Sequence, residues 1–159
     1  MDAVHPRVLG YLGRALSLEL TAVQQYMTQA SLVDLWGDQA SADRFRSETV
    51  EELQHAERIV QRMLSLGVAP AASQLQPSTH AADLVGLLEQ NAELEQQLVD
   101  HYSEASRFCT LINDRDNGAF FSALLEDEQH HSRDLEAWLT ELGGRRNPGY
   151  RRYGGRASF

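Results

Sequence analysis

Glu52-Leu53-Gln54-His55 decides the fold, because a Glu-x-x-His step places a carboxylate and an imidazole on one face of a helix. The same step recurs at Glu128-Gln129-His130-His131. A lone glutamate lies 33 residues before each copy, and a tyrosine follows each lone glutamate by seven residues. A constant offset of 76 residues therefore relates two sets, which are Glu19, Tyr26, Glu52 and His55, and Glu95, Tyr102, Glu128 and His131.

The glutamates and histidines of this repeat form the ligand set of a carboxylate-bridged dimetal site in a four-helix bundle. Four buried carboxylates without compensation would be very costly, and two metal cations neutralise them. Carboxylate and imidazole ligands with open positions favour Fe, and secondarily Mn or Zn. One Glu-x-x-His step alone would most often be a solvated pair. Two copies at equal spacing, each with a glutamate inside an apolar stripe, predict a metal site.

Apolar residues recur at steps of three and four along most of the chain, which predicts an all-α protein. We expect four helices of about 28 residues, each ~40 Å long. Their expected ranges are 6–33, 39–66, 82–111 and 119–142. The second helix is expected to bury Phe45, Val50, Leu53, Ala56, Ile59, Val60, Met63 and Leu64.

The connections between these helices predict the topology. Residues 34–38 and 113–118 are rich in Asp, Asn and Gly and read as short turns, so each makes an antiparallel hairpin. Residues 67–81 form a linker of about 15 residues that reaches ~50 Å when extended. A linker of this length predicts a crossover along the whole four-helix bundle. Ser78 or Thr79 is expected to cap the third helix.

The two half-sites are expected at the same height in the bundle. In an antiparallel hairpin, residues equidistant from the turn lie level. The midpoint of Glu19 and Glu52 falls inside the first turn, and that of Glu95 and Glu128 at the start of the second. Each lone glutamate should therefore face its own Glu-x-x-His step near mid-bundle.

Length and charge limit the other functions. The 159 residues suit one bundle domain over 1–144, with a basic tail over 145–159 that lacks the pattern of a regular helix. Net charge is −9, and every acid lies before Gly143, so we expect no nucleic-acid partner. There is no transmembrane run and no signal segment, and the only cysteine is Cys109, so we expect a cytoplasmic protein without disulfides.

The remaining histidines and the tyrosines of the repeat have simpler interpretations. His130 is next to His131 but off its face, so we expect it at the surface or behind the ligands. His5, His80 and His101 are expected to be solvated. Tyr26 and Tyr102 are core aromatics, and either could donate a hydrogen bond or an electron to a di-iron site.

Five segments carry a family resemblance. They are Glu19-Leu20-x-Ala22-x-x-Gln25-Tyr26, Trp36-Gly37, Glu52-x-x-His55-Ala56 with Arg62-x-Leu64-x-Leu66, Leu94-Glu95 and Asp127-Glu128-x-x-His131. Through them the chain resembles the bacterioferritins over about residues 4–142. The resemblance implies a ferritin-like bundle whose di-iron centre oxidises Fe(II) with O2 or H2O2. It also implies storage of ferric mineral in a 24-subunit shell.

The resemblance also implies a role for each site residue. Glu52 and Glu128 align with the bridging carboxylates, and Glu19 and Glu95 with the terminal ones. His55 and His131 would each serve one iron, and Tyr26 aligns with the tyrosine beside the centre.

Three positions depart from the family. Leu53 stands where the methionine that holds haem between two subunits is found, so we expect no haem in a homo-oligomer, while a mixed oligomer with a haem-binding paralogue stays open. Ser47 stands where some members have a histidine of an inner-surface iron site, and only the nearby acid, Glu51, is kept. The tail carries Pro148 and several glycines, so a fifth helix is not expected.

Two other hypotheses remain at this point. The chain could be a di-iron oxidase or peroxidase that acts as a dimer and stores no iron, which the interrupted tail favours. It could also be a metal-free helical interaction protein, which the buried carboxylates disfavour. The acidic body favours storage, because carboxylate-lined surfaces attract cations.

Overall fold

The computed structural model describes residues 3–143, and four helices account for most of them. All four lie close to the ranges that hydrophobic periodicity predicts. They are α1 Pro6–Leu35, α2 Gln39–Ser65, α3 Leu84–Leu111 and α4 Arg115–Glu141. The predicted basic tail, and the prediction that it forms no regular fifth helix, lie outside the described residues.

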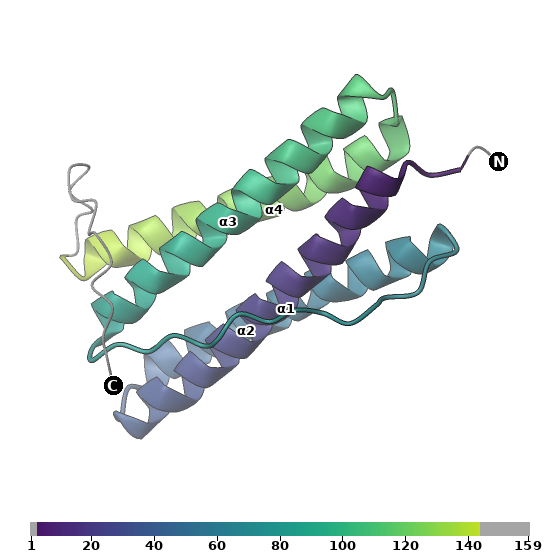
Figure 1. Cartoon of the computed structure of the whole chain (residues 1–159). Helices are drawn as coiled ribbons and strands as arrows, with labels where there is room; N and C mark the ends of the chain where they lie inside the picture. Colours follow the sequence, from purple (N-terminus) through teal and green to yellow (C-terminus); the bar gives the residue numbers. More distant parts are fainter. Residues whose placement is uncertain (1–2, 144–159) are drawn as a thin grey trace, which may run out of the picture.

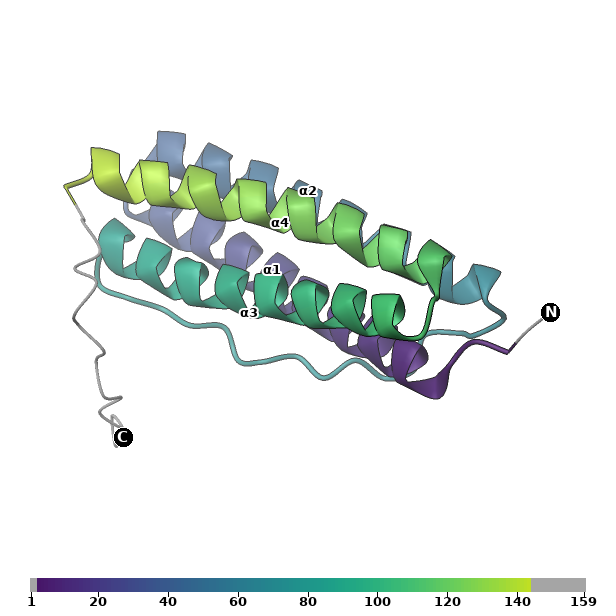
Figure 2. The same cartoon turned by 90° about the horizontal axis from the view of Figure 1, so that it is seen from above.

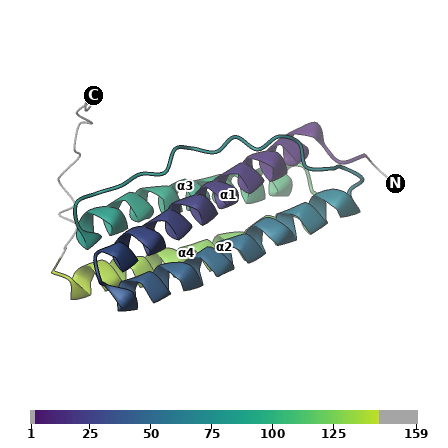
Figure 3. The ribbon, with the colours of Figure 1, turned by 90° about the horizontal axis from the view of Figure 1, so that it is seen from below.

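The helices form an antiparallel four-helix bundle made of two hairpins, α1 with α2 and α3 with α4 (Figure 1). The segment between α2 and α3 runs the whole length of the bundle along its α1 and α3 side (Figures 2 and 3). The predicted crossover is therefore confirmed. Because of this crossover, α3 runs parallel to α2. The two hairpins are therefore related by an approximate twofold axis across the bundle.

Side chains of α1 and α3 bind the crossover segment. Ser17 Oγ accepts from the Gln74 amide at 3.1 Å, and Thr21 Oγ1 accepts from the Gln76 amide at 3.2 Å. These hydroxyls satisfy backbone donors that an extended segment cannot pair with itself. The segment thus lies against the bundle at fixed places along its length.

Aspartates begin three of the helices. Asp38, Asp83 and Asp114 accept hydrogen bonds from the backbone of Ser41, Gly86 and Asn117, respectively. Such caps satisfy amide groups that have no partner within the helix. The expectation that Ser78 or Thr79 caps the third helix was wrong, because Asp83 does so four residues later.

The fourth helix begins earlier than its apolar pattern indicated. Asp114 caps it, so Arg115 to Gly118 belong to α4 and not to the turn. Gly118 lies close to α3, where an added Cβ would be 3.3 Å from the Cβ of Cys109. This glycine therefore allows close helix packing and does not break the helix.

The apolar core is divided into two clusters. One contains Leu12, Tyr26, Ile59, Leu98 and Phe121, and the other contains Val33, Phe45, Leu88, Trp138 and Leu139. Glu52 on α2 and Glu128 on α4 lie between the two clusters along their helices. Each cluster removes large apolar side chains from water, which is the main favourable term in folding.

Part of the predicted apolar face of α2 is exposed. Val50, Leu53 and Leu64 are about half exposed, although Phe45 and Ile59 are fully buried. The apolar stripe of α2 is wider than the face that the bundle covers. The opposite error concerns His101 on α3, which was expected to be solvated. It is buried, and its Nε2 donates to the Tyr11 carbonyl at 2.9 Å.

No helix within residues 3–143 is both long and apolar enough to cross a membrane. The buried face of each helix carries acids or amides among its apolar residues. On α1 these are Glu19 and Gln29, which are both fully buried.

Candidate metal centre

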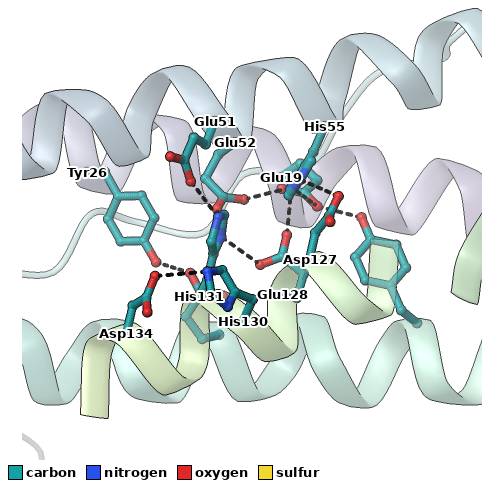
Figure 4. Close-up of polar contacts among 12 residues, drawn as sticks. Glu19, Tyr26, Glu51, Glu52, His55, Asp127, Glu128, His130, His131 and Asp134 are labelled. Atoms are coloured by element: carbon teal, nitrogen blue, oxygen red, sulfur yellow. Dashed lines mark hydrogen bonds and ion pairs between the residues drawn. The ribbon is translucent and has the colours of Figure 1, made fainter. Parts of the chain in front are cut away.

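Each of the four helices contributes to one cluster at the centre of the bundle (Figure 4). The helix α1 gives Glu19, and α3 gives Glu95. The other two helices each give a Glu-x-x-His step, and i and i+3 share a helical face. The structure thus brings together all six predicted ligands, which are Glu19, Glu52, His55, Glu95, Glu128 and His131.

Ligand atoms in this cluster form two overlapping groups. One contains Glu19, Glu52, His55 and Glu128, and within each group the ligand atoms lie within 4.8 Å of one another. The other group contains Glu52, Glu95, Glu128 and His131. Glu52 and Glu128 belong to both groups, whereas each remaining residue belongs to one. This is the arrangement of two metal positions that share two carboxylates.

The histidines contact carboxylates of the opposite hairpin. Nδ1 of His55 lies 2.8 Å from Oε1 of Glu128, and Nδ1 of His131 lies 2.8 Å from Oε1 of Glu52. Each Nδ1 is also 3.4–3.5 Å from the glutamate three residues earlier on its own helix. Both rings therefore present Nδ1 to the shared carboxylates.

The buried carboxylates have unused acceptor capacity. Glu19, Glu52, Glu95 and Glu128 are at most 2% exposed, and each has at least one buried oxygen without a hydrogen-bond partner. Unsatisfied buried acceptors are rare, because each loses its hydration without replacement. Oxygen and imidazole nitrogen are the donor set of iron, manganese and zinc, so these residues fit a pair of such cations.

In the metal-free cluster, two of the buried glutamates and both histidines have raised pKa values, so protons offset the charge that cations would otherwise neutralise. Burial, together with the charge of Glu52, raises the pKa of Glu19 well above its usual value, and burial raises that of Glu95 in the same way. Burial lowers the pKa of His131, but hydrogen bonds to Glu128 and Glu52 outweigh this and raise it to about 11. The pKa of His55 is raised more strongly for the same reasons. The raised pKa values favour the protonated forms of these carboxyls and imidazoles, which makes the metal-free cluster less negative.

Each tyrosine of the repeat donates to the lone glutamate of the other hairpin. The Tyr26 hydroxyl donates to Oε1 of Glu95, and the Tyr102 hydroxyl donates to Oε1 of Glu19 at 2.5 Å. Burial raises the pKa of both phenols, so both stay protonated and act as donors. Each bond fixes one carboxylate oxygen and leaves the other free.

Two acids outside the set of repeated glutamates, tyrosines and histidines lie on the far side of the two imidazoles. Oε2 of Glu51 is 2.5 Å from Nε2 of His131, and Oδ2 of Asp127 is 3.4 Å from Nε2 of His55 (Figure 4). Glu51 and Asp127 are also related by the offset of 76. That offset was the available signal, and it extends the repeat by one residue.

A pocket of about 360 Å³ leads to the cluster between α2 and α4. It reaches Glu52, Glu95 and His131. The acids Glu48, Glu51, Asp134 and Glu141 line its outer part. The position related to Glu48 by the repeat is Leu124, so the approach to the second metal position has no equivalent acid there.

The other histidines named from the sequence lie away from the cluster. His130 is exposed, and its Nε2 is 3.5 Å from Oδ2 of Asp134. His5 accepts the Arg7 amide at the start of α1. Cys109 is a free, fully buried thiol, and burial raises its pKa to about 11, as expected for an inert residue.

A family match, similar sequences and a similar solved structure all indicate the same family for this chain. The ferritin family, defined by a ferritin-like domain, matches residues 9–144. A bacterioferritin of Brucella melitensis biotype 1 is 31% identical over 149 residues, covering 94% of this chain and 91% of that protein. A bacterioferritin of Rhodobacter capsulatus is 31% identical over 134 residues, covering 84% of this chain and 83% of that protein.

A solved structure of the Rhodobacter capsulatus bacterioferritin superposes with a TM-score of 0.85 and 30% identity, covering 89% of both chains. That structure is described as having a metal-free dinuclear site and a haem iron in a crystallographic special position. The bundle and its cluster define a ferritin-like protein. Within that class, this chain belongs to the bacterioferritin family.

Proposed function

We propose that this chain is an iron-storage protein that oxidises Fe(II) at a di-iron centre within each subunit. Two overlapping ligand groups that share Glu52 and Glu128 carry this proposal. The oxidant is O2 or H2O2, and the ferric product is stored as mineral. Similarity to bacterioferritins along most of the chain favours storage over the non-storing dimeric oxidase.

The roles of the ligands follow from the two groups. Glu52 and Glu128 would contribute to both iron positions, since they belong to both groups. Glu19 with His55 completes one position, and Glu95 with His131 completes the other. Bound iron supplies the electrons for reduction of the oxidant. Six protein ligands for two ions would leave room for a small oxidant to bind.

Tyr26 completes the proposed catalytic set. Its hydroxyl donates to Glu95, which keeps the carboxylate oriented toward the centre. The phenol is buried and hydrogen-bonded to Glu95, and we propose that it can supply one electron to the oxidant. Tyr102 holds Glu19 in the equivalent way.

The acidic pocket supports access for Fe(II) as substrate. Carboxylates that line a cleft concentrate cations near its mouth. Glu48 lines this pocket one helical turn before Glu52, and we propose that it passes Fe(II) toward Glu52 and Glu95.

Storage requires an enclosed space, so we propose a homo-oligomer of 24 subunits. The proposed setting is a reducing cytoplasm, where Cys109 stays a free thiol. We propose no haem in that homo-oligomer, because the Leu53 side chain, which is about half exposed, offers no ligand. A mixed shell with a haem-binding paralogue is compatible with this assignment. No nucleic-acid or membrane partner is proposed.

Two measurements test the function. Aerobic addition of Fe(II), followed by absorbance in the near ultraviolet, should show rapid oxidation in the wild type and strongly slowed oxidation in Glu52→Ala. The exposed acid Glu57 gives a matched control, and Glu57→Ala should behave as the wild type. Equal rates of Fe(II) oxidation in Glu52→Ala and the wild type would contradict the assignment of the metal site.

Native mass separates storage from its alternative. A species of about 24 subunits that retains ferric iron after gel filtration is expected. A stable dimer that oxidises iron but releases it would favour the non-storing oxidase.

A further inference from the structure

Two acids outside the predicted ligand set occupy equivalent places in the two hairpins. Glu51 precedes Glu52 on α2, and Asp127 precedes Glu128 on α4. Both side chains are about half exposed, at 49% and 45%, whereas the glutamates beside them are fully buried. A half-exposed acid normally turns to water, so the direction of these two requires an explanation.

Both acids turn across the bundle to a histidine of the other hairpin. Glu51 of α2 contacts Nε2 of His131 on α4, and Asp127 of α4 contacts Nε2 of His55 on α2. Each histidine has its other nitrogen, Nδ1, toward the shared carboxylates. Each imidazole therefore lies between an outer acid and the metal cluster.

This relation has a chemical consequence. A ligating histidine has to present an unprotonated nitrogen to the metal, so its remaining proton belongs on the other nitrogen. A carboxylate at Nε2 accepts that proton in a hydrogen bond, which fixes both the tautomer and the ring plane. The ring planes of His55 and His131 lie only 26° apart, in agreement with a common restraint on both.

We propose that Glu51 and Asp127 are positioning residues, each of which orients the histidine of the opposite hairpin so that Nδ1 faces one metal position. Glu51 serves the position formed with Glu95 and His131. Asp127 serves the position formed with Glu19 and His55. This assignment rests on the proposed metal centre and adds that each outer acid controls one metal position and not the other.

The two acids are not equal. Glu51 contacts His131 at 2.5 Å, and within residues 3–143 this is its one described ion pair. Asp127 has a shorter side chain, and its Oδ2 contacts both Nε2 of His55, at 3.4 Å, and the Arg58 guanidinium, at 2.8 Å. Glu51 should therefore restrain its histidine more strongly than Asp127 does.

The contact with His131 gives Glu51 a role at the metal centre. This role does not depend on a histidine at position 47, where this chain has Ser47. The Glu51 carboxylate points to the imidazole and so acts on the centre itself (Figure 4). The acid is thereby used although its usual partner residue is missing.

The test is an anaerobic titration of the metal-free, full-length oligomer with Co(II), followed by its visible absorption and by competition with a chelator. The wild type should bind two Co(II) per chain. Glu51→Ala should weaken one of these equivalents by about 10- to 100-fold and leave the other unchanged. Asp127→Ala should weaken the other equivalent by a smaller factor. Glu51→Gln, which keeps an acceptor oxygen, should lose less than Glu51→Ala.

Double variants identify the equivalent that each acid controls. In a His131→Ala background, Glu51→Ala should have no further effect on Co(II) affinity. In a His55→Ala background, it should still weaken the remaining equivalent. Additive losses in the His131→Ala background, or equal weakening of both equivalents by Glu51→Ala, would overturn the proposal.

Three control variants separate positioning from general surface charge. Glu57→Ala and Glu126→Ala remove exposed acids from α2 and α4 and should leave both affinities unchanged. Arg58→Ala removes the arginine partner of Asp127 without removing the acid, and it should not reproduce Asp127→Ala. A wild type that binds no Co(II) would contradict the metal centre, whereas a normal wild type with an unaffected Glu51→Ala would contradict the positioning role alone.

Discussion

His55 and His131 are 76 residues apart in the sequence, yet their imidazole rings are stacked across the centre of the bundle with centroids 5.6 Å apart. Each ring faces a glutamate of the opposite hairpin at 2.8 Å. The centre is therefore held by contacts between hairpins, and neither hairpin alone contains a complete metal position.

Metal binding should release protons. The metal-free protein holds extra protons on Glu19, Glu95, His55 and His131, because the pKa of each is raised. Cations take the place of these protons, so binding of two Co(II) ions should release protons, including the one that each imidazole holds at pH 7. A pH indicator in weakly buffered solution measures the release. Glu57→Ala should match the wild type, and binding without proton release would contradict the assigned protonation states.

Glu48 should make the metal-free protein less stable as pH rises. Burial, assisted by the charges of Glu52 and Glu51, raises the pKa of Glu48 to about 7. The folded chain therefore holds a proton that the unfolded chain loses near pH 4.5, so stability falls from about pH 4.5 to 7 and then levels off. The loss from this group is of order ~3 kcal/mol at most.

Replacement of Glu48 tests this pH dependence. Glu48→Gln should raise the Tm of the metal-free protein at pH 8 and leave it unchanged near pH 4. Glu141→Gln changes an exposed acid of the same pocket and should alter neither value. A Glu48→Gln variant with the pH profile of the wild type would be the contrary result.

The two tyrosines should contribute about equally to metal affinity. Each phenol donates one hydrogen bond to a terminal carboxylate. Tyr26→Phe and Tyr102→Phe should each weaken one Co(II) equivalent by about two- to tenfold, the value of one hydrogen bond. If Tyr26 also supplies an electron, Fe(II) oxidation will fall more in Tyr26→Phe than in Tyr102→Phe. Equal oxidation rates in the two variants would restrict Tyr26 to holding Glu95.

Asn91 should be important for stability although it is not a ligand. It is fully buried one helical turn before Glu95, and its oxygen accepts from both Gln25 and Gln29 at 2.8 Å. Asn91→Leu should lower the free energy of unfolding by about 3 kcal/mol, because it leaves buried amide groups without partners. Thermal unfolding measures this. Gln96→Leu, on the exposed side of α3, should have little effect, and equal Tm values for both variants would contradict the role of the network.

The visible spectrum should lack a haem band. Protein purified from a haem-replete host should show no Soret absorption, because Leu53 cannot ligate iron. A Soret band that persists in the pure homo-oligomer would contradict this, and one that appears only after co-expression with a methionine-bearing paralogue would support a mixed shell.

Much of the fold followed from local patterns. The helices lie within a few residues of their periodic segments. The equal distances of Glu19 and Glu52, and of Glu95 and Glu128, from their turns predicted that each lone glutamate meets a Glu-x-x-His step. Errors occurred where burial depends on neighbours. Leu53 has an apolar side chain at a helical spacing, but none of the four described helices covers it, and His101 is polar yet lies buried against the Tyr11 carbonyl.

The sequence by itself determined the helices and the six candidate ligands, because periodicity and residue spacing are properties of one segment or of an internal repeat. Only the tertiary structure decided that each histidine is paired with an acid of the other hairpin, and that the pocket approaches the centre from the side of Glu48. These relations depend on how α2 and α4 pack across the bundle. Helix packing brings together side chains that are far apart in the sequence, and local sequence patterns do not predict which of these side chains will be in contact.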